Sequence, residues 1–223
     1  AYIEMTIDLM EKFGAKVNRS NNTFTCQGPY KACDYKVEGD WSSALFYIVG
    51  GAEVKGLRLD SLQADMKALE YLETLGYENI SNKGVCLRQV NSYTNERILD
   101  ASNMPDAIPI LSIASALTKG KTKVINIERL RLKESDRVKS TCQMLENLGV
   151  EVELDESSFS FNSVSYFKSC TIDSFMDHRI AMAGSIAATF AQGPVKILNA
   201  QVVSKSYPNF YEDFLSLGGE YVK

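Results

Sequence analysis

Charged side chains gather at three places where the sequence predicts the start of a helix. They lie before a 107–118 helix, in LKESDR before a 136–148 helix, and in DHR opening a 179–192 helix: Asp106, Lys133, Glu134, Asp136, Arg137, Asp177, His178 and Arg179. Helix N-termini present unpaired N–H groups and a positive dipole end, so they favour anions. Added lysines and arginines predict a phosphate or carboxylate site, and carboxylates beside it indicate proton transfer.

Each of these residues also has a purely structural interpretation. Asp136 and Asp177 are typical helix caps. Lys133 and Arg137, four residues apart, could form a solvated helix face. Lys205, in a turn before a proline, could simply be solvated. The functional interpretation requires the three helix starts to converge on one face, which is expected if their segments are structural repeats.

The composition limits the classes of function. The chain has 223 residues, 45% hydrophobic and 23% charged, which is typical of a globular protein with a sizeable core. A net charge of -4 argues against nucleic acid as the main partner, so an anionic ligand would need a local cluster of cations. No apolar run is long enough to cross a bilayer, and no membrane partner is predicted.

The cysteines and the single histidine argue against a metal or redox cofactor. Five cysteines are scattered without a C-x-x-C pair, which is typical of free thiols in a reducing, cytoplasmic compartment. His178 alone cannot build a histidine-based metal site, and it argues against a Ser-His-Asp triad. We therefore expect neither a metal nor a cofactor.

Internal repetition predicts the architecture. Four helix-like segments end at a glycine followed by a strand-like run, about 60 to 75 residues apart, at Gly14, Gly76, Gly149 and Gly218. Apolar helices precede the last three copies, each followed by a β-type run: VKGLRL, TKVINI and VKILNA. This pattern predicts an α/β protein of three similar subdomains with buried upstream helices. Duplication for stability alone, as in solenoids, is the alternative.

The first copy lacks its upstream half. Residues 1–37 supply one helix and a hairpin-like stretch, with Gly28-Pro29 as the turn signal. We therefore expect the chain to belong to a longer parent whose N-terminal part is absent.

Five strings resemble the signature blocks of the enolpyruvylshikimate phosphate synthase family: VEGDWSSA, MPDA, RLKESDR, DHRIAMA and SKSYPNFYEDF. They occur in the family's order across essentially the whole chain. The sister family, UDP-N-acetylglucosamine enolpyruvyl transferase, shares the repeated fold but lacks the KESDR block.

The resemblance implies two globular domains, each of three βαβαββ units with helices inside and sheets outside, an inside-out α/β barrel. Substrates would bind in the cleft between the domains. Residues 38–223 would form one domain of three subdomains, and residues 1–37 the last piece of the other. The complete enzyme would be a monomer, and this chain would need the missing N-terminal half as its partner.

The implied reaction transfers the enolpyruvyl group of phosphoenolpyruvate to the 5-hydroxyl of shikimate 3-phosphate, in the pathway to aromatic amino acids. By resemblance, Asp106 is the base, Glu134 the acid, and Lys133 reaches the shikimate phosphate and the reacting centre. The other implied roles are substrate binding by Tyr2, Arg137, Arg179 and Lys205, and orientation by Asp177 and His178.

Two positions depart from the family pattern. Arg129 stands where some members carry a shikimate-contacting asparagine, and Trp41 where many carry a small residue. The absent half would supply a catalytic lysine, further phosphate-binding residues and the segment that sets glyphosate sensitivity. Two alternatives remain: a non-catalytic anion-binding domain, and the UDP-sugar transferase.

Overall fold

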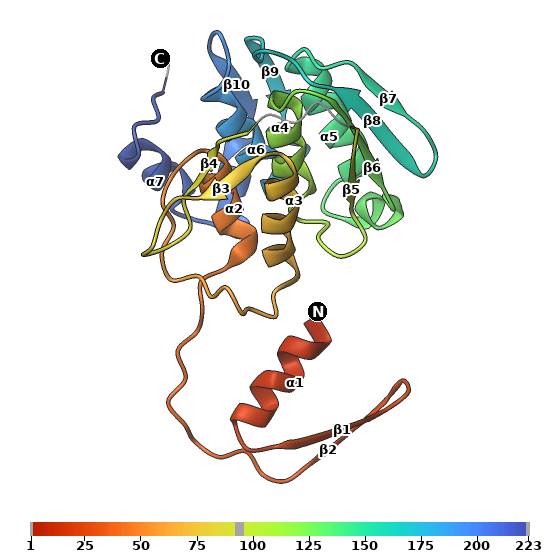
Figure 1. Ribbon diagram of the computed structural model, residues 1–223, viewed down its shortest axis with the longest axis vertical. Helices are drawn as coiled ribbons and strands as arrows, with labels where there is room; N and C mark the ends of the chain where they lie inside the picture. Colours follow the sequence, from red (N-terminus) through yellow and green to blue (C-terminus); the bar gives the residue numbers. More distant parts are fainter. Residues whose placement is uncertain (1, 92–95, 222–223) are drawn as a thin grey trace.

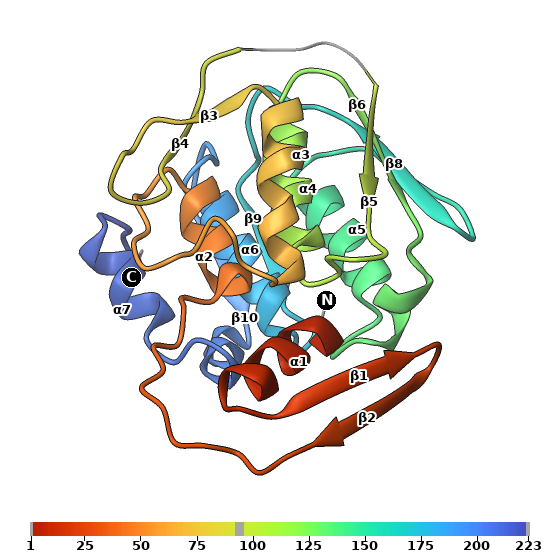
Figure 2. The ribbon, with the colours of Figure 1, turned by 60° about the horizontal axis from the view of Figure 1, so that its bottom comes forward.

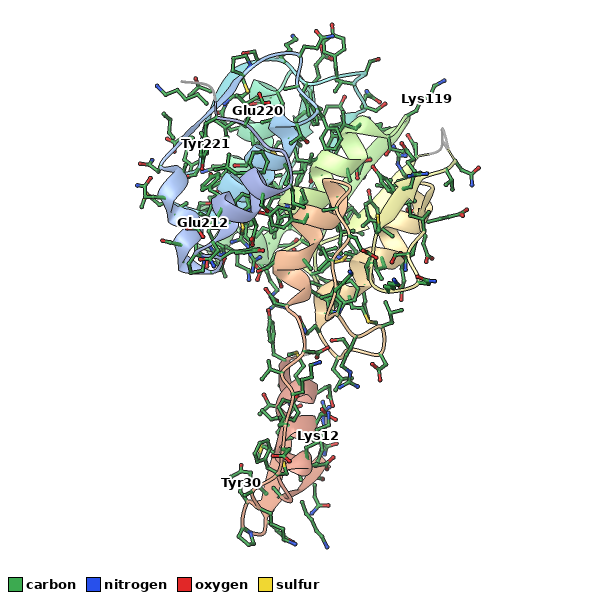
Figure 3. The ribbon with its side chains drawn as sticks, turned by 90° about the vertical axis from the view of Figure 1, so that its left-hand side faces the viewer. Lys12, Tyr30, Lys119, Glu212, Glu220 and Tyr221 are labelled. Carbon is green, nitrogen blue, oxygen red and sulfur yellow. The ribbon has the colours of Figure 1, made fainter. Side chains whose placement is uncertain are left out.

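A computed structural model describes residues 2–91 and 96–221. Its N-terminal part is a helix and a hairpin that extend away from the rest of the molecule (Figures 1 and 3): α1 (Tyr2–Lys12), β1 (Lys16–Ser20) and β2 (Thr23–Gln27). None of the α1 residues is buried. The hairpin turn lies at Asn21-Asn22 and not at Gly28-Pro29, so the predicted turn position is wrong. Asn21 adopts the left-handed conformation (φ 53°) that asparagine tolerates.

The middle of the body contains one complete βαβαββ unit. In chain order its elements are β5 (Arg97–Asp100), α4 (Ile108–Leu117), β6 (Lys121–Ile125), α5 (Arg137–Asn147), β7 (Val152–Leu154) and β8 (Ser158–Asn162). The sheet order is β5-β6-β8-β7, with β5 and β6 parallel and the other pairs antiparallel. The predicted repeating unit is thus confirmed in its full form.

The units on either side contain fewer strands among the described residues. The first has α2 (Trp41–Val49), α3 (Ala68–Thr74), β3 (Tyr77–Asn79) and β4 (Leu87–Gln89); the third has β9 (Cys170–Asp173), α6 (His178–Ala188), β10 (Val195–Leu198) and α7 (Phe210–Ser216). The predicted strand VKGLRL is wrong, because only Val54 forms a bridge, to Val85. Gly56 has a φ of +85°, which interrupts the extended chain.

The three upstream helices α2, α4 and α6 form the centre of the body, with the strands around the outside (Figure 2). Every residue of α4 from Ile108 to Ala116 is buried, as expected for a helix that is apolar all round. Helix α5 is amphipathic and buries its predicted stripe of Val138, Cys142 and Leu145, with Leu148 at its C-cap. Helices inside and sheets outside are therefore confirmed.

Glycine ends the downstream helices as predicted. The four terminating glycines all have positive φ, between 85° and 97°. At Gly76 a Cβ atom would lie 2.1 Å from the carbonyl oxygen of Asn91, so no other residue fits there. The third upstream helix is shorter than predicted. It ends at Ala188 and not at 192, because Ala191 already pairs with Phe167 in a parallel bridge.

Two further observations concern the described residues. No helix in residues 2–91 and 96–221 has the length and apolar character needed to cross a membrane. The five cysteines carry free thiols, of which Cys26 and Cys33 are exposed and Cys142 is buried.

Residues 2–91 and 96–221 also contain three short 3₁₀ helices, two of which lead to charged residues. They are η1 (Ala64–Lys67), η2 (Glu128–Leu132) and η3 (Ala200–Lys205). The second runs directly into the KESDR segment, and the third ends on Lys205.

Candidate active site

The starts of α4, α5 and α6 meet at one end of the body, as the repeats predict. Arg137, the first residue of α5, reaches both Asp106, just before α4, and Asp177, the N-cap of α6. Asp106 and Asp177 lie 31 and 40 positions, respectively, from Arg137 in the chain. Three helix N-termini are therefore brought together, and with them three positive dipole ends.

The Arg137 side chain is completely buried and binds three carboxylates. Its Nε and Nη2 donate to the two oxygens of Asp177 at 2.8 and 3.1 Å. Nη1 donates to Asp106 and Nη2 also donates to Glu134, both at 2.6 Å. The solvated-face alternative is therefore wrong for Arg137, whose side chain is 0% exposed. In this arrangement Arg137 holds the two candidate catalytic carboxylates on one guanidinium group.

Asp177 is both a helix cap and an ion-pair partner. Its side chain is fully buried and accepts a hydrogen bond from the backbone N–H of Arg179 at 2.9 Å, which caps α6. The same carboxylate accepts the two Arg137 bonds and one from the Ser135 hydroxyl at 3.1 Å. Asp136 acts as a cap of α5, accepting from the Lys139 N–H. The cap interpretation is thus confirmed for both residues, and for Asp177 it is only part of the role.

Asp106 lies among cations and does not cap α4. Its carboxylate is 3.1 Å from Lys133 Nζ, 2.6 Å from Arg137 Nη1 and 4.0 Å from Arg179 Nη2. Burial pushes the pKa of Asp106 upward, but the Arg137, Arg179 and Lys133 charges outweigh it and hold the pKa below its ordinary value. Asp106 is therefore ionised at neutral pH, as a general base must be.

Glu134 has both carboxylate oxygens paired with cations. Oε2 contacts Arg137 at 2.6 Å, and Oε1 contacts Lys205 Nζ at 3.2 Å. Burial raises the pKa of Glu134, but its backbone hydrogen bond, Arg137 and Lys205 together lower it below the usual range. A carboxylate in this state accepts a proton only after one of these cations is withdrawn.

Arg179 is a buried cation with unused hydrogen-bond donors. It is only 6% exposed, and its Nε and Nη1 have no hydrogen-bond partner within the described part of the chain. The guanidinium carbon lies 5.9 Å from the centre of the Phe46 ring, which supports one face of the group. Because an unpaired buried donor is costly, these two donors of Arg179 indicate a place for an anion.

His178 is buried beside Arg179 and is only 5% exposed. Its Nδ1 has no hydrogen-bond partner among residues 2–91 and 96–221. Burial, and then the Arg179 charge, lower the pKa of His178, so the ring is neutral at pH 7.

Lys205 and Tyr2 approach the cluster from outside it. The Lys205 side chain is 54% exposed, on a segment held by the Tyr47 hydroxyl, which donates to the Phe210 carbonyl. Tyr2 lies at the start of α1. Burial is the main cause of its raised pKa, and the nearby negative charge of Asp106 raises it further. Between α1 and the body lies a cavity of about 650 Å³, lined by Tyr2, Asp40 and other residues.

Sequence reasoning missed two polar groups beside this site. Asp65, in η1, is 5% exposed and accepts a hydrogen bond from the Ser42 hydroxyl, and burial raises its pKa. Ser135, inside the KESDR string, bonds Asp177. Asp65 carries no local signal, because only the tertiary fold brings η1 to the site. The two departures have structural partners: Arg129 Nη1 donates to the Ser102 carbonyl and the Trp41 indole to the Arg58 carbonyl.

A sequence profile of the EPSP synthase family (3-phosphoshikimate 1-carboxyvinyltransferase) matches residues 1–214. The chain belongs to the EPSP synthase family. It is 42% identical over 226 residues to the 3-phosphoshikimate 1-carboxyvinyltransferase of Clostridium perfringens, covering 98% of this chain and 53% of that protein. The Clostridioides difficile protein is 38% identical over 227 residues, with 98% and 52% covered.

Solved structures confirm the predicted fold class. EPSP synthase from Acinetobacter baumannii has a TM-score of 0.79 at 24% identity, covering 95% of this chain and 53% of that one. The enolpyruvyl transferase NikO from Streptomyces tendae has a TM-score of 0.73 at 16% identity, with 98% and 53% covered. The chain spans about half the length of the curated relatives it matches. The family match confirms the resemblance and leaves the UDP-sugar alternative without support.

Proposed function

We propose that this chain carries one wall of the active site that transfers the enolpyruvyl group of phosphoenolpyruvate to the 5-hydroxyl of shikimate 3-phosphate and releases phosphate. The observation that carries this proposal is Arg179, a buried cation that lies 4.0 Å from Asp106 and has two donors without a partner among the described residues. Residues 1–37 belong, in this proposal, to the opposite domain, and the additional half found in the relatives completes the site.

Binding of two anionic substrates rests on the cations around the converging helix starts. Nε and Nη1 of Arg179, which lack a partner among the described residues, lie on either side of Nη2, so the guanidinium group can present a parallel pair of donors that includes Nη2 to a carboxylate such as that of phosphoenolpyruvate. Lys205 is exposed and can reach a phosphate. Arg137 has its donors engaged by Asp106, Glu134 and Asp177, so it contacts substrate only by releasing one of these carboxylates.

The two partly exposed carboxylates divide the proton transfers. Ionised Asp106 accepts the proton of the 5-hydroxyl as its oxygen bonds C2 of phosphoenolpyruvate, while Glu134 delivers a proton to the methylene carbon. The resulting tetrahedral adduct then loses phosphate from C2 and a proton from the methyl group, which restores the double bond. Lys133, 3.1 Å from Asp106, stabilises the negative charge near the reacting centre.

Glu134 must first be protonated, and its ion pair with Lys205 controls when this protonation occurs. An incoming phosphate competes for Lys205 and removes one of the cations that lower the pKa of Glu134. The acid is then formed only when substrate is present. Neutral His178 and buried Asp177 orient Arg179 and Arg137 and take no part in the proton transfers.

The test is the release of inorganic phosphate from phosphoenolpyruvate, measured with and without shikimate 3-phosphate, on this chain alone and after completion by the other half. We expect release that depends on shikimate 3-phosphate in the completed enzyme. Binding of phosphoenolpyruvate without release in the completed enzyme would favour the non-catalytic anion-binding alternative. The retained Asp106 and Glu134 argue against that alternative, because anion binding gains nothing from nearby carboxylates.

The Glu134→Gln variant separates binding from turnover. Glutamine keeps the size of the side chain and its acceptor oxygen toward Arg137 but cannot deliver a proton. We expect phosphoenolpyruvate binding near the wild-type level and turnover lower by about 100-fold or more, the typical contribution of a general acid. Single-turnover phosphate release and equilibrium binding measure the two quantities. Undiminished turnover would remove Glu134 from the acid role.

We further propose that the completed enzyme is a cytoplasmic monomer. The exposed thiols of Cys26 and Cys33 suit a reducing compartment.

A further inference from the structure

A short chain of hydrogen bonds is joined to Arg137 through Asp177. The Ser135 hydroxyl donates to Asp177 Oδ2 at 3.1 Å and lies 2.8 Å from the Ser140 hydroxyl. Ser140 is 2% exposed, and Asp177 is fully buried. Ser135 is therefore the link between the buried carboxylate and the first turn of α5.

The buried carboxylate of Asp177 needs all of its donors. Four hydrogen bonds reach it: two from Arg137, one from the Arg179 backbone and one from Ser135. Oδ2 receives the Ser135 bond together with the one from Arg137 Nε. A buried carboxylate with several donors is fixed in place, and the removal of one donor loosens the others.

We propose that Ser135 is a positioning residue for the enolpyruvyl transfer: through Asp177 it fixes the Arg137 guanidinium group between Asp106 and Glu134. The inference rests on the proposed function for its catalytic consequence, but its geometric part concerns this chain alone. Ser135 does not cap α5, because the Asp136 side chain accepts the Lys139 N–H bond. The Ser135 hydroxyl is thus free to donate a hydrogen bond to Asp177.

The consequence for Asp106 and Glu134 follows from their surroundings. Asp106 faces Lys133 and Arg137 from the α5 side, Arg179 from α6, and Tyr2 of α1. Glu134 faces Arg137, Lys205 of η3 and His178 of α6. Arg137 is the cation common to both carboxylates and is the largest charge effect lowering the pKa of each. A displaced guanidinium group would let both pKa values rise toward their ordinary values.

The experiment uses Ser135→Ala, Ser135→Thr and a matched control, Ser160→Ala. Ser160 also donates to a carboxylate, Glu153, at 2.9 Å, but it lies on β8, away from the site. Carboxyl-carbon NMR titration of this chain measures the pKa values of Asp106 and Glu134 and does not require enzymatic activity. Phosphate release by the completed enzyme gives kcat, KM and the pH profile of kcat/KM.

In Ser135→Ala we expect both carboxylates to titrate at higher pH than in wild type. The acid limb of kcat/KM, which reports the ionisation of Asp106, should move to higher pH in the same variant. At neutral pH kcat/KM should fall by about tenfold, the value of one hydrogen bond to a charged group. Ser135→Thr should restore the titrations and most of the rate, and Ser160→Ala should change neither.

Unchanged titrations in a folded Ser135→Ala variant would overturn the inference, even if the rate fell, because a merely structural residue would have that effect. If Ser135→Ala does not fold, Ser135→Cys keeps the size with a weaker donor and is judged by the same titrations. An inactive wild-type completed enzyme would refute the proposed function, while the NMR titrations would still decide the role of Ser135.

Discussion

Arg137→Ala should lower the free energy of unfolding of this chain by about 3–5 kcal/mol, the cost of removing one partner from a buried ion pair. The variant leaves Asp177 fully buried without its cation and leaves Asp106 and Glu134 close together without the charge between them. Denaturant unfolding at neutral pH, followed by circular dichroism, measures the loss.

The matched control is Lys139→Ala on the same helix. Lys139 pairs with Asp136 at 3.4 Å, but its side chain is 73% exposed, so its removal should change stability by no more than about 0.5 kcal/mol. Equal losses in the two variants would show that Arg137 is not the centre of the cluster.

The Arg137 effect should also depend on pH with a defined sign. In the wild type, Asp106 and Glu134 have lowered pKa values, so they stabilise the fold above their ordinary pKa values, and this contribution is lost as the pH falls through the lower folded values. Arg137→Ala lacks the Arg137 share of that contribution at any pH. The difference between variant and wild type should therefore shrink as the pH falls below about 4.

Arg179→Ala should keep the fold and lose phosphoenolpyruvate binding. Because Nε and Nη1 have no partner among the described residues, truncation breaks no hydrogen bond of these two atoms, and the losses to stability are the Phe46 contact and the 4.0 Å charge pair with Asp106. The variant loses a buried cation and its charge-assisted hydrogen bonds to the substrate carboxylate, which predicts a fall in kcat/KM of about 100-fold or more. Phosphate release by the completed enzyme and thermal unfolding of the chain measure the two effects.

Arg129→Ala is the control for Arg179→Ala, because within the described part of the chain Arg129 donates only to the Ser102 carbonyl. It should change kcat/KM little. An Arg179→Ala variant that unfolds would mean that the residue is structural. A folded variant with normal phosphoenolpyruvate binding would place the anion site elsewhere.

Local features of the fold could be predicted from the sequence because each depends on neighbouring residues. The glycine terminators, the Asp136 and Asp177 caps and the buried stripe of α5 follow from backbone sterics and helical period. Predictions failed where two local signals competed. The β-type run from Val54 contains Gly56 in a left-handed conformation, and Asn21-Asn22 forms the turn in place of Gly28-Pro29.

The sequence predicted which helix starts come together at the candidate site, but not how their side chains pair. The sequence placed Asp106, Arg137 and Asp177 at helix starts, and repetition predicted that these starts would converge. The sequence could not predict that Arg137 is fully buried against three carboxylates, or that Arg179 has donors without a partner among the described residues. The spacing of Lys133 and Arg137 is the same on a solvated helix face.

The family, the βαβαββ unit and the residue types of the site could be predicted from the sequence, because motifs, repeats and capping patterns are local features of the chain. The pairing of each cation with its carboxylate is known only from the tertiary structure. The pairings of Arg137 with Asp106 and Asp177, and of Lys205 with Glu134, join residues 31 to 71 positions apart in the chain, and they depend on how α4, α5, α6 and η3 pack. Burial then sets the strength of each charge pair, since the same two groups interact far more strongly away from water.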